Sequence, residues 1–274
     1  MPIRRPCIGV FDSGFGGLTV LRELIERAPN ADYVYFGDTA RLPYGSKSAE
    51  TVARYALSAC HYLETQGAQV LVIACNTATA LALNQISAAA HVPVIGVVEP
   101  GAECALAASR SRKVVVLATE ATVSSHAYQK ALRQRGVEVR EKACPLLVPL
   151  VEEGWVEHPV TEQVARIYLK EAFTDGSQTA DVLLLGCTHY PLLKPLLRRI
   201  VPPNVSIVDS AESTAHAVAL KLNFSPLRDS NDRERRAVPR RIFFATDSVE
   251  KFQRLGRMFL AQPIAGVQHV DLEE

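Results

Sequence analysis

The chain has 274 residues, of which 48% are hydrophobic and 22% charged, values that are ordinary for a folded globular protein. Its 30 Lys and Arg against 29 Asp and Glu give a formal net charge of +1, which argues against a nucleic-acid partner. No apolar run approaches the ~18 residues of a membrane-spanning helix, and Asp12 interrupts the short apolar stretch near the start, a poor signal peptide. The sequence predicts a cytoplasmic protein without membrane contact.

Short apolar runs rich in Val, Ile and Leu alternate along the chain with segments of helical period. Strands are predicted at 8–13, 33–38, 69–75, 92–98, 113–119, 181–187, 205–210 and 241–247. Helices are predicted at 18–28, 50–64, 78–90, 126–136, 162–172 and 191–200. Several runs are apolar throughout, as in strands buried on both faces of a parallel sheet. The alternation of strand and helix therefore predicts an α/β fold with mainly parallel sheets.

The chain shows a weak internal duplication. VLVIACNT (70–77) is similar to VLLLGCTH (182–189), because in each an apolar strand ends in a cysteine before a small polar cluster. Upstream of each lies another strand that ends in hydroxyl residues, IGVFDSG (8–14) and VVVLATEAT (114–122). This pattern predicts two similar lobes related by a pseudo-two-fold axis, with an active site in the cleft between them.

The chain is expected to cross between the two lobes twice. Crossings near Val98 and Asp209 predict a discontinuous first lobe of 1–97 plus 209–274 and a second lobe of 98–208. The stretch 225–241 mixes both signs of charge and is interpreted as a solvated surface connection.

Polar residues gather where the predicted strands end. Ligands of open α/β sheets bind at the carboxyl ends of strands, where helix N-termini point, so we expect the site there. The residues at these ends are Asp12, Ser13, Asp38, Cys75, Asn76, Thr77, Glu99, Thr119, Cys187, Thr188, His189, Asp209 and Ser210.

Two of the cysteines stand apart from the rest. The six lie at 7, 60, 75, 104, 144 and 187, with no zinc-site spacing, and a reducing compartment is expected. Most cytosolic cysteines are small buried hydrophobes. Cys75 and Cys187, however, each end an apolar strand before a polar helix start. Because the positive end of a helix dipole favours a thiolate, the sequence predicts a lowered pKa for both thiols.

Three chemistries use two thiols on facing lobes. A disulfide switch is one, although such pairs are commonly close in sequence. A metal site is another, but it needs three or four ligands and only His189 lies nearby, so no metal is expected. The third is proton transfer at one carbon from two opposite faces, with one thiolate and one thiol. Two lobes related by a two-fold axis supply that geometry directly.

Two loops can hold the substrate. The loop from Asp12 to Gly17 is not a dinucleotide fingerprint, because Thr19 stands where the third glycine is needed. It is interpreted as a glycine-rich turn whose amides can hold a carboxylate. In the turn at 41–45, Tyr44 and the amide of Gly45 can reach a substrate.

Asp38, Glu152 and His189 are polar groups that can orient an ammonium group or tune a thiol. Neither a nucleotide-binding loop nor a metal-ligand cluster occurs in the sequence, and no cofactor is expected.

Taken together, these segments resemble glutamate racemases, within the aspartate/glutamate racemase superfamily. The segments are FDSGFGGLTV (11–20), GDTARLPYG (37–45), ACNTAT (74–79), GVVEPG (96–101), CPLLVPLVEEG (144–154) and LGCTHYPLL (185–193). The segment 118–125 follows the threonine-rich pattern of the family loosely, and 225–241 does not belong to it.

The resemblance implies a cofactor-independent enzyme that interconverts L- and D-glutamate and supplies D-glutamate for peptidoglycan. It implies that Cys75 acts on the D enantiomer with help from Asp12, and that Cys187 acts on the L enantiomer with help from His189. The implied substrate contacts are Asp12, Ser13, Tyr44, Gly45, Asn76, Thr77, Thr188 and His189, with Asp38 and Glu152 in supporting roles.

Two alternatives stay open on the sequence alone. One is an aspartate racemase or another amino-acid racemase of the same superfamily. The other is a non-catalytic regulatory protein, such as a partner of DNA gyrase, against which the intact Cys75 and Cys187 speak. A homodimer is expected.

Overall fold

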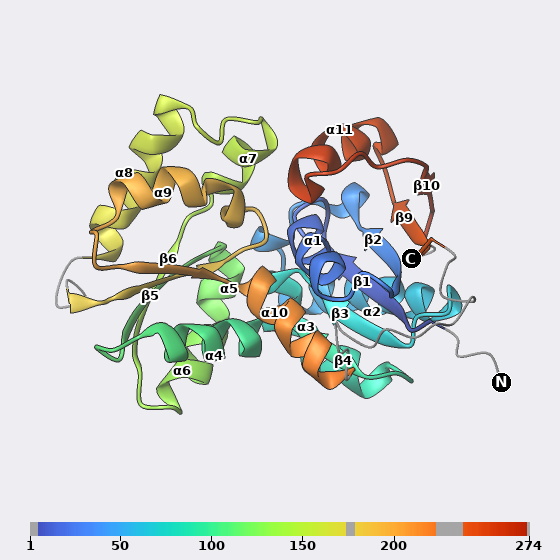
Figure 1. Ribbon diagram of the computed structural model, residues 1–274, viewed down its shortest axis with the longest axis horizontal. Coiled ribbons are helices and arrows are strands. Elements are labelled where there is room, and N and C mark those ends of the chain that lie inside the picture. Colours follow the sequence, from blue (N-terminus) through green and yellow to red (C-terminus); the bar gives the residue numbers. More distant parts are fainter. Residues whose placement is uncertain (1–4, 174–178, 223–237, 273–274) are drawn as a thin grey trace.

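The computed structural model describes residues 5–173, 179–222 and 238–272. These residues form two lobes that lie side by side, each built on its own parallel sheet (Figure 1). The predicted α/β fold with two lobes is therefore confirmed. Most of the predicted surface connection at 225–241 lies outside the described residues.

The two sheets repeat one strand order. The first contains, in spatial order, β10 (Val267–His269), β9 (Arg241–Ala245), β2 (Asp32–Gly37), β1 (Cys7–Asp12), β3 (Val70–Ile73) and β4 (Val94–Gly96). The second contains β6 (Glu138–Ala143), β5 (Lys113–Ala118), β7 (Val182–Gly186) and β8 (Ser206–Asp209). All neighbouring strands are parallel. The run β2-β1-β3-β4 matches β6-β5-β7-β8, so the duplication read from the sequence corresponds to a repeat of topology.

All the predicted strands are present, and the sequence missed two further ones, β6 and β10. Both are edge strands. In β6, with the sequence EVREKA, only Val139 is buried, and β10 has three residues, none of them buried. Neither segment carries a continuous apolar run, which is why the pattern did not reveal these two.

Helices connect the strands of each sheet. The α-helices are α1 (Leu18–Arg27), α2 (Ala49–Thr65), α3 (Asn76–Ala89), α4 (Val98–Ala108), α5 (Glu120–Ser125), α6 (Ala127–Arg133), α7 (Leu147–Glu152), α8 (Pro159–Ala172), α9 (Lys194–Ile200), α10 (Ser210–Lys221) and α11 (Val249–Leu260). Short 3₁₀ helices are η1 (Thr39–Arg41), η2 (Tyr44–Ser46) and η4 (Tyr190–Leu193). The six predicted helices are confirmed, whereas α4, α5, α7, α10 and α11 were not predicted.

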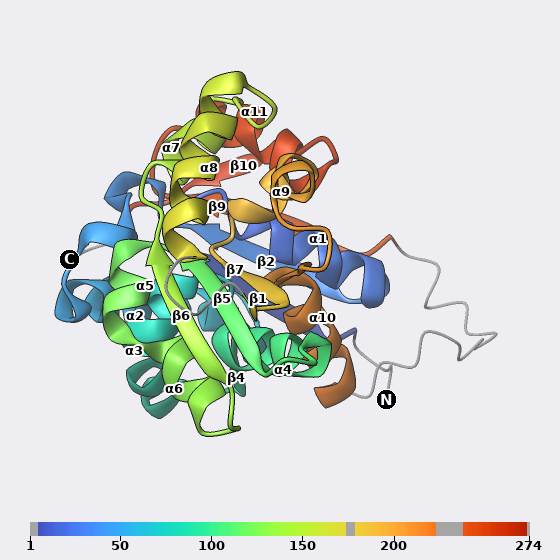
Figure 2. The same cartoon turned by 90° about the vertical axis from the view of Figure 1, so that its left-hand side faces the viewer.

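Helices cover both faces of the sheets. In the second lobe, α8 and α9 lie on one face and α4 and α6 on the other (Figures 1 and 2). α10 packs on α1 of the first lobe and on α4 of the second. Because α10 packs on helices of both lobes, the lobe limits at 97 and 209 stay a prediction. The chain does pass from one sheet to the other after Gly96 and leave the second sheet after Asp209.

Of the hydrophobic clusters among the described residues, one runs through both lobes, a second lies in the first lobe and a third in the second lobe. The cluster that runs through both lobes contains Val10 and Phe252 of the first lobe, Leu183 and Leu196 of the second, and Ala215 of α10 between them. All five side chains are inaccessible to solvent. The strands that carry the polar ends are thus held by continuous packing and not only by the chain crossings.

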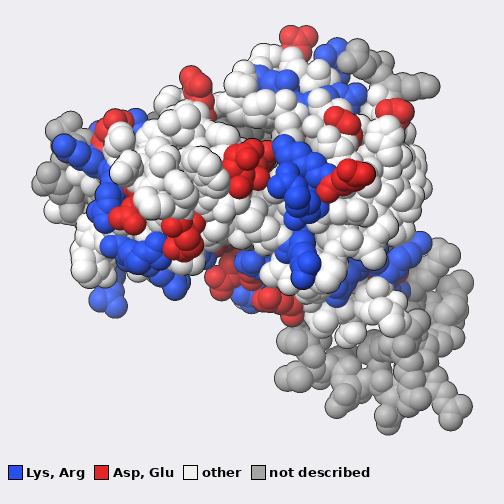
Figure 3. All heavy atoms as spheres, turned by 90° about the horizontal axis from the view of Figure 1, so that it is seen from above, with Lys and Arg blue, Asp and Glu red and all other residues white. Residues whose placement is uncertain are grey.

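None of the helices in the described part of the chain is both long and apolar enough to cross a membrane. On the face seen from above, acidic and basic side chains are interspersed (Figure 3).

Leu183 provides a test of the shared core. Leu183→Ala in β7 removes a fully buried side chain, and we expect the free energy of unfolding to fall by about 2–5 kcal/mol. Leu220→Ala is the matched control, because Leu220 is 65% exposed, and a change within about 0.5 kcal/mol is expected. Urea denaturation measures both. Equal losses in the two variants would contradict this description of the core.

Candidate active site

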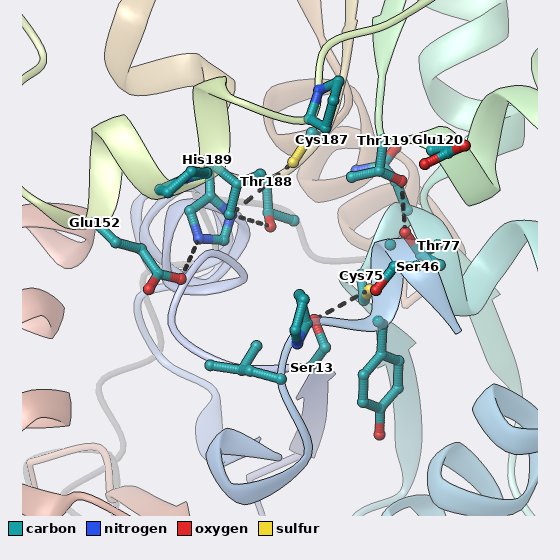
Figure 4. Close-up of a pocket in the computed structure, with 18 of the residues that line it drawn as sticks. Ser13, Ser46, Cys75, Thr77, Thr119, Glu120, Glu152, Cys187, Thr188 and His189 are labelled. Atoms are coloured by element: carbon teal, nitrogen blue, oxygen red, sulfur yellow. Dashed lines mark hydrogen bonds and ion pairs between the residues drawn. The ribbon is translucent and has the colours of Figure 1, made fainter. Parts of the chain in front are cut away.

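A cavity of about 470 Å³ lies between the lobes. The first lobe contributes Ser13, Thr39, Leu42, Pro43, Tyr44, Gly45, Ser46, Cys75, Asn76, Thr77 and Lys251 to its wall. The second lobe contributes Thr119, Glu120, Pro145, Val148, Pro149, Glu152, Cys187, Thr188 and His189. Figure 4 shows Cys75 and Cys187 on opposite sides of it. Of the residues predicted for the site, Asp12 and Asp38 are not on the wall.

Cys75 lies at the N-terminus of α3, as predicted, and it is Cys75 itself that caps this helix. Its Sγ accepts a hydrogen bond from the amide of Ala78 at 3.4 Å and lies 3.5 Å from Oγ of Ser13. Burial nevertheless raises the pKa of this thiol to about 12, with the charge of Asp12 acting in the same direction. The prediction of a lowered pKa at Cys75 is therefore wrong, because desolvation outweighs the helix amide and Ser13.

Cys187 follows the equivalent strand β7 but does not cap a helix. The short helix η4 starts only at Tyr190, and no side-chain hydrogen bond caps it. Cys187 instead faces an imidazole, with its Sγ 3.9 Å from Nδ1 of His189. The two thiols therefore have matched strands but different chemical surroundings.

His189 is buried and has a partner on each ring nitrogen. Nδ1 lies 3.9 Å from Sγ of Cys187 and 3.5 Å from Oγ1 of Thr188, and Nε2 lies 3.2 Å from Oε1 of Glu152 (Figure 4). Burial opposes the charged imidazolium, but the bonds to Cys187 and Glu152 outweigh it and raise the pKa of His189 to about 10. At neutral pH the ring is thus a cation beside Cys187.

Glu152 ends α7 and connects His189 to the first lobe. Its second oxygen, Oε2, accepts a hydrogen bond from Nζ of Lys251 in α11 at 3.3 Å. Burial would raise the pKa of Glu152, but the bond to His189 and the charge of Lys251 lower it below its ordinary value. Lys251 was missed from the sequence. The apolar spacing of Phe252, Leu255 and Phe259 could have revealed its helix, though not its partner.

Asp12 is fully buried behind the cavity wall. Its Oδ2 accepts a hydrogen bond from the amide of Gly14 at 2.9 Å, and Oδ1 has no hydrogen-bond partner among the described residues. Burial raises the pKa of Asp12, and the charge of His189 opposes this. Ser13, the next residue, is on the cavity wall and Asp12 is not, so the contact of Asp12 with the substrate stays a prediction.

The glycine-rich loop brings the lobes close together. Ser13 is the residue of this loop on the cavity wall, whereas Gly16 packs against the second lobe. A Cβ at Gly16 would lie 2.2 Å from Oγ1 of Thr188 and 2.5 Å from Nδ1 of His189. Gly16 thus serves the close approach of Thr188 and His189, and the binding of a carboxylate by the amides of this loop stays a prediction.

Asp38 lies outside the cavity wall and holds Tyr44, which is part of that wall. It is fully buried and accepts hydrogen bonds from the hydroxyl of Tyr44 at 2.5 Å, from Thr246 at 2.9 Å and from Arg41 at 3.2 Å. The hydroxyl of Tyr44 is thus bound to Asp38. This geometry agrees with a supporting role for Asp38 and leaves other atoms of Tyr44, and Gly45, to face the cavity.

Asn76 and Thr77 join the two lobes. The Asn76 amide accepts a hydrogen bond from the hydroxyl of Tyr128 at 2.5 Å and donates one to Ser210 at 3.3 Å. The Thr77 hydroxyl lies 2.9 Å from that of Thr119 and 3.2 Å from that of Thr122. Both residues line the cavity, yet their side chains already have partners.

Three other strand-end candidates, Glu99, Asp209 and Ser210, are also not on the cavity wall. Glu99 is part of α4 and pairs with Arg135 at 2.9 Å on the surface. Asp209 caps α10 by accepting hydrogen bonds from Ala211 at 2.8 Å and from Glu212 at 3.1 Å. Nowhere in the described ranges do three or more His, Cys, Asp or Glu side chains form a group that could hold a metal ion.

The chain matches the Asp/Glu/Hydantoin racemase family over residues 8–218. It belongs to this family. It is 61% identical to a glutamate racemase of Koribacter versatilis, with 99% of each chain covered. A glutamate racemase isoform of Bacillus anthracis superposes with a TM-score of 0.88 at 36% identity, covering 97% of this chain and 98% of that one. The glutamate racemase of Francisella tularensis in complex with D-glutamate superposes with a TM-score of 0.84 at 35% identity, covering 98% of each.

The raised pKa of Cys75 in this racemase-family chain predicts slow alkylation. The thiolate is the nucleophile, so the rate of modification of Cys75 by iodoacetamide should rise about tenfold per pH unit between pH 7 and 9. A free thiol with an ordinary pKa of about 8.5 levels off in the same range and is the control. Mass spectrometry of the Cys75 peptide gives the rate. A rate that stays constant from pH 7 would show that the thiolate is already formed.

Proposed function

We propose that this chain interconverts L- and D-glutamate without a cofactor, with Cys75 and Cys187 as the two acid–base groups. The observation that carries the proposal is the placement of both thiols on the wall of one inter-lobe cavity, one from each lobe. The glutamate racemases to which the chain is similar support the choice of substrate.

The surroundings of the two thiols suggest a resting state. The pKa of about 12 keeps Cys75 as a thiol at neutral pH, and the imidazolium of His189 provides a counter-ion for a Cys187 thiolate. That thiolate takes the Cα proton of L-glutamate, and the electron pair of the broken C–H bond stays on Cα and spreads into the α-carboxylate. The Cys75 thiol then delivers its proton to the opposite face and forms D-glutamate. The reverse reaction exchanges the two roles.

The Cα proton is very weakly acidic, so the cavity must also stabilise the carbanion. Preorganised donors in a site shielded from water usually make the largest contribution. The wall offers the hydroxyls of Ser13 and Thr188 and the N-terminus of α3 at Asn76. Hydroxyl and amide donors of this kind suit the carboxylates of glutamate.

Asp12 acts in this proposal without touching the substrate. Its charge raises the pKa of Cys75, which makes the Cys75 thiolate a stronger base when D-glutamate is the substrate. The D-glutamate formed would supply peptidoglycan synthesis in the cytoplasm, and the enzyme would act as a homodimer.

Replacement of either thiol tests the assignment. Cys75→Ala or Cys187→Ala removes an acid–base group and should lower racemisation by at least about 10³-fold. Cys60→Ala is the control, since Cys60 is a buried residue of α2 that does not line the cavity, and it should stay within about tenfold of the parent rate. Circular dichroism of L-glutamate and of L-aspartate follows the rates. Near-normal racemisation by Cys75→Ala, or faster racemisation of aspartate than of glutamate, would refute the proposal.

Isotope incorporation tests the two opposite faces. In deuterated water at a few per cent conversion of L-glutamate, the D product should carry deuterium at Cα, because Cys75 delivers solvent hydrogen. The remaining L-glutamate should carry almost none, because Cys187 returns the proton that it has just taken. Mass spectrometry of the separated enantiomers measures both. Substantial protium in the D product would point to a single base serving both faces.

A further inference from the structure

A salt bridge joins the lobes at the end of the cavity where α7 and α11 face each other (Figure 1). Glu152 stands in the middle of it, with Oε1 3.2 Å from Nε2 of His189 and Oε2 3.3 Å from Nζ of Lys251. One carboxylate oxygen therefore faces the second lobe, and the other binds the first. A series of interacting side chains thus runs from Cys187 through His189 and Glu152 to Lys251.

Lys251 is held in place by its own lobe. Its Nζ lies 5.3 Å from the ring centre of Phe15, within the range of a cation–π interaction. Phe15 is buried and packs on Phe252, with 5.7 Å between the ring centres. The ammonium is thus fixed by the β1–α1 loop and α11, although its side chain is 42% exposed.

Apart from the bonds with His189 and Lys251, little holds the side chain of Glu152 in place. It is the last residue of α7, a helix of six residues, and its side chain is 15% exposed. A carboxylate at such a helix end can turn into solvent at small cost, and its bond to His189 would then be lost. The bond from Lys251 opposes that rotation.

We propose that Lys251 is a positioning residue that acts across the cleft, holding Glu152 against His189 so that His189 stays paired with Cys187. The proposal deepens the function proposed above and rests on it for the role of Cys187. Lys251 itself needs no contact with the substrate.

The direction in which the pKa of His189 changes when Lys251 is removed distinguishes a positioning role from a purely electrostatic one. The titratable and charged groups around His189 are Cys187, Asp12 and Glu152, and Lys251 lies beyond Glu152. If Lys251 acted only as a nearby positive charge, its removal would make the imidazolium more stable and raise the pKa of His189. If it positions Glu152, its removal releases the carboxylate, and the pKa of His189 falls.

The test is an NMR titration of the histidine side chains in the full chain. The His189 signal is assigned by its loss in His189→Asn. In Lys251→Met, which keeps the length of the side chain but not its charge, we expect the pKa of His189 to fall by about one unit or more from the parent value. Lys251→Arg keeps both the charge and the donor and should retain the parent value. Arg254→Met removes a positive charge from the same helix away from the cavity and should change nothing.

An unchanged or raised pKa of His189 in Lys251→Met would overturn the proposal, as would an equal fall in Arg254→Met. The pH profile of kcat/KM for glutamate gives a second measurement, in which the alkaline limb of Lys251→Met should move to lower pH and that of Lys251→Arg should not.

Because the NMR titration uses no substrate, the two proposals can fail separately. A fall in the pKa of His189 in a chain that does not racemise glutamate would support the role of Lys251 and refute the proposed function. Racemisation with no response of His189 would do the reverse.

Discussion

The site depends on the geometry of parallel sheets. Each strand of such a sheet must be followed by a crossover, so the loops that leave the carboxyl ends collect along one edge. Here two sheets with the matched orders β2-β1-β3-β4 and β6-β5-β7-β8 direct those edges at one cavity. Cys75 follows β3 and Cys187 follows β7, the equivalent strands of the repeat. The facing thiols are a result of the repeated topology.

The fold is repeated, but the two halves of the site are chemically different. Cys75 lies against a helix amide and a serine hydroxyl, and burial keeps it protonated. Cys187 lies beside a buried imidazole whose pKa is raised to about 10. A reaction that removes a proton on one face and adds one on the other needs groups in opposite protonation states. The asymmetry of the two neighbourhoods supports the two-thiol reaction proposed above.

The sequence predicted what depends on local pattern. The buried strands, the amphipathic helices and the polar residues at strand ends follow from periodicity and from the rule that ligands bind at carboxyl ends. It did not predict the edge strands β6 and β10, which lack an apolar pattern, or α10, whose surroundings come from both lobes. Short helices such as α7, with six residues, give too little periodicity to recognise.

Within the site, the sequence located residues better than it described their interactions. The lowered pKa expected for Cys75 failed because burial depends on tertiary packing, which the helix position alone does not show. Asn76 is on the cavity wall as predicted, but its side-chain bonds to Tyr128 of the second lobe and to Ser210 of α10 could not be read from the sequence. Lys251 reaches Glu152 from a helix nearly a hundred residues away in sequence, and no local pattern encodes such a pair.

The continuous core through α10 has a thermodynamic consequence. Val10, Ala215 and Leu183 belong to one contiguous cluster, so apolar surface of each lobe is buried by a helix that the other lobe also uses. Neither lobe can unfold while α10 remains packed on the other without exposing that surface to water. We therefore expect the two lobes to unfold as one cooperative unit, so that a substitution that weakens one lobe lowers the melting temperature of both.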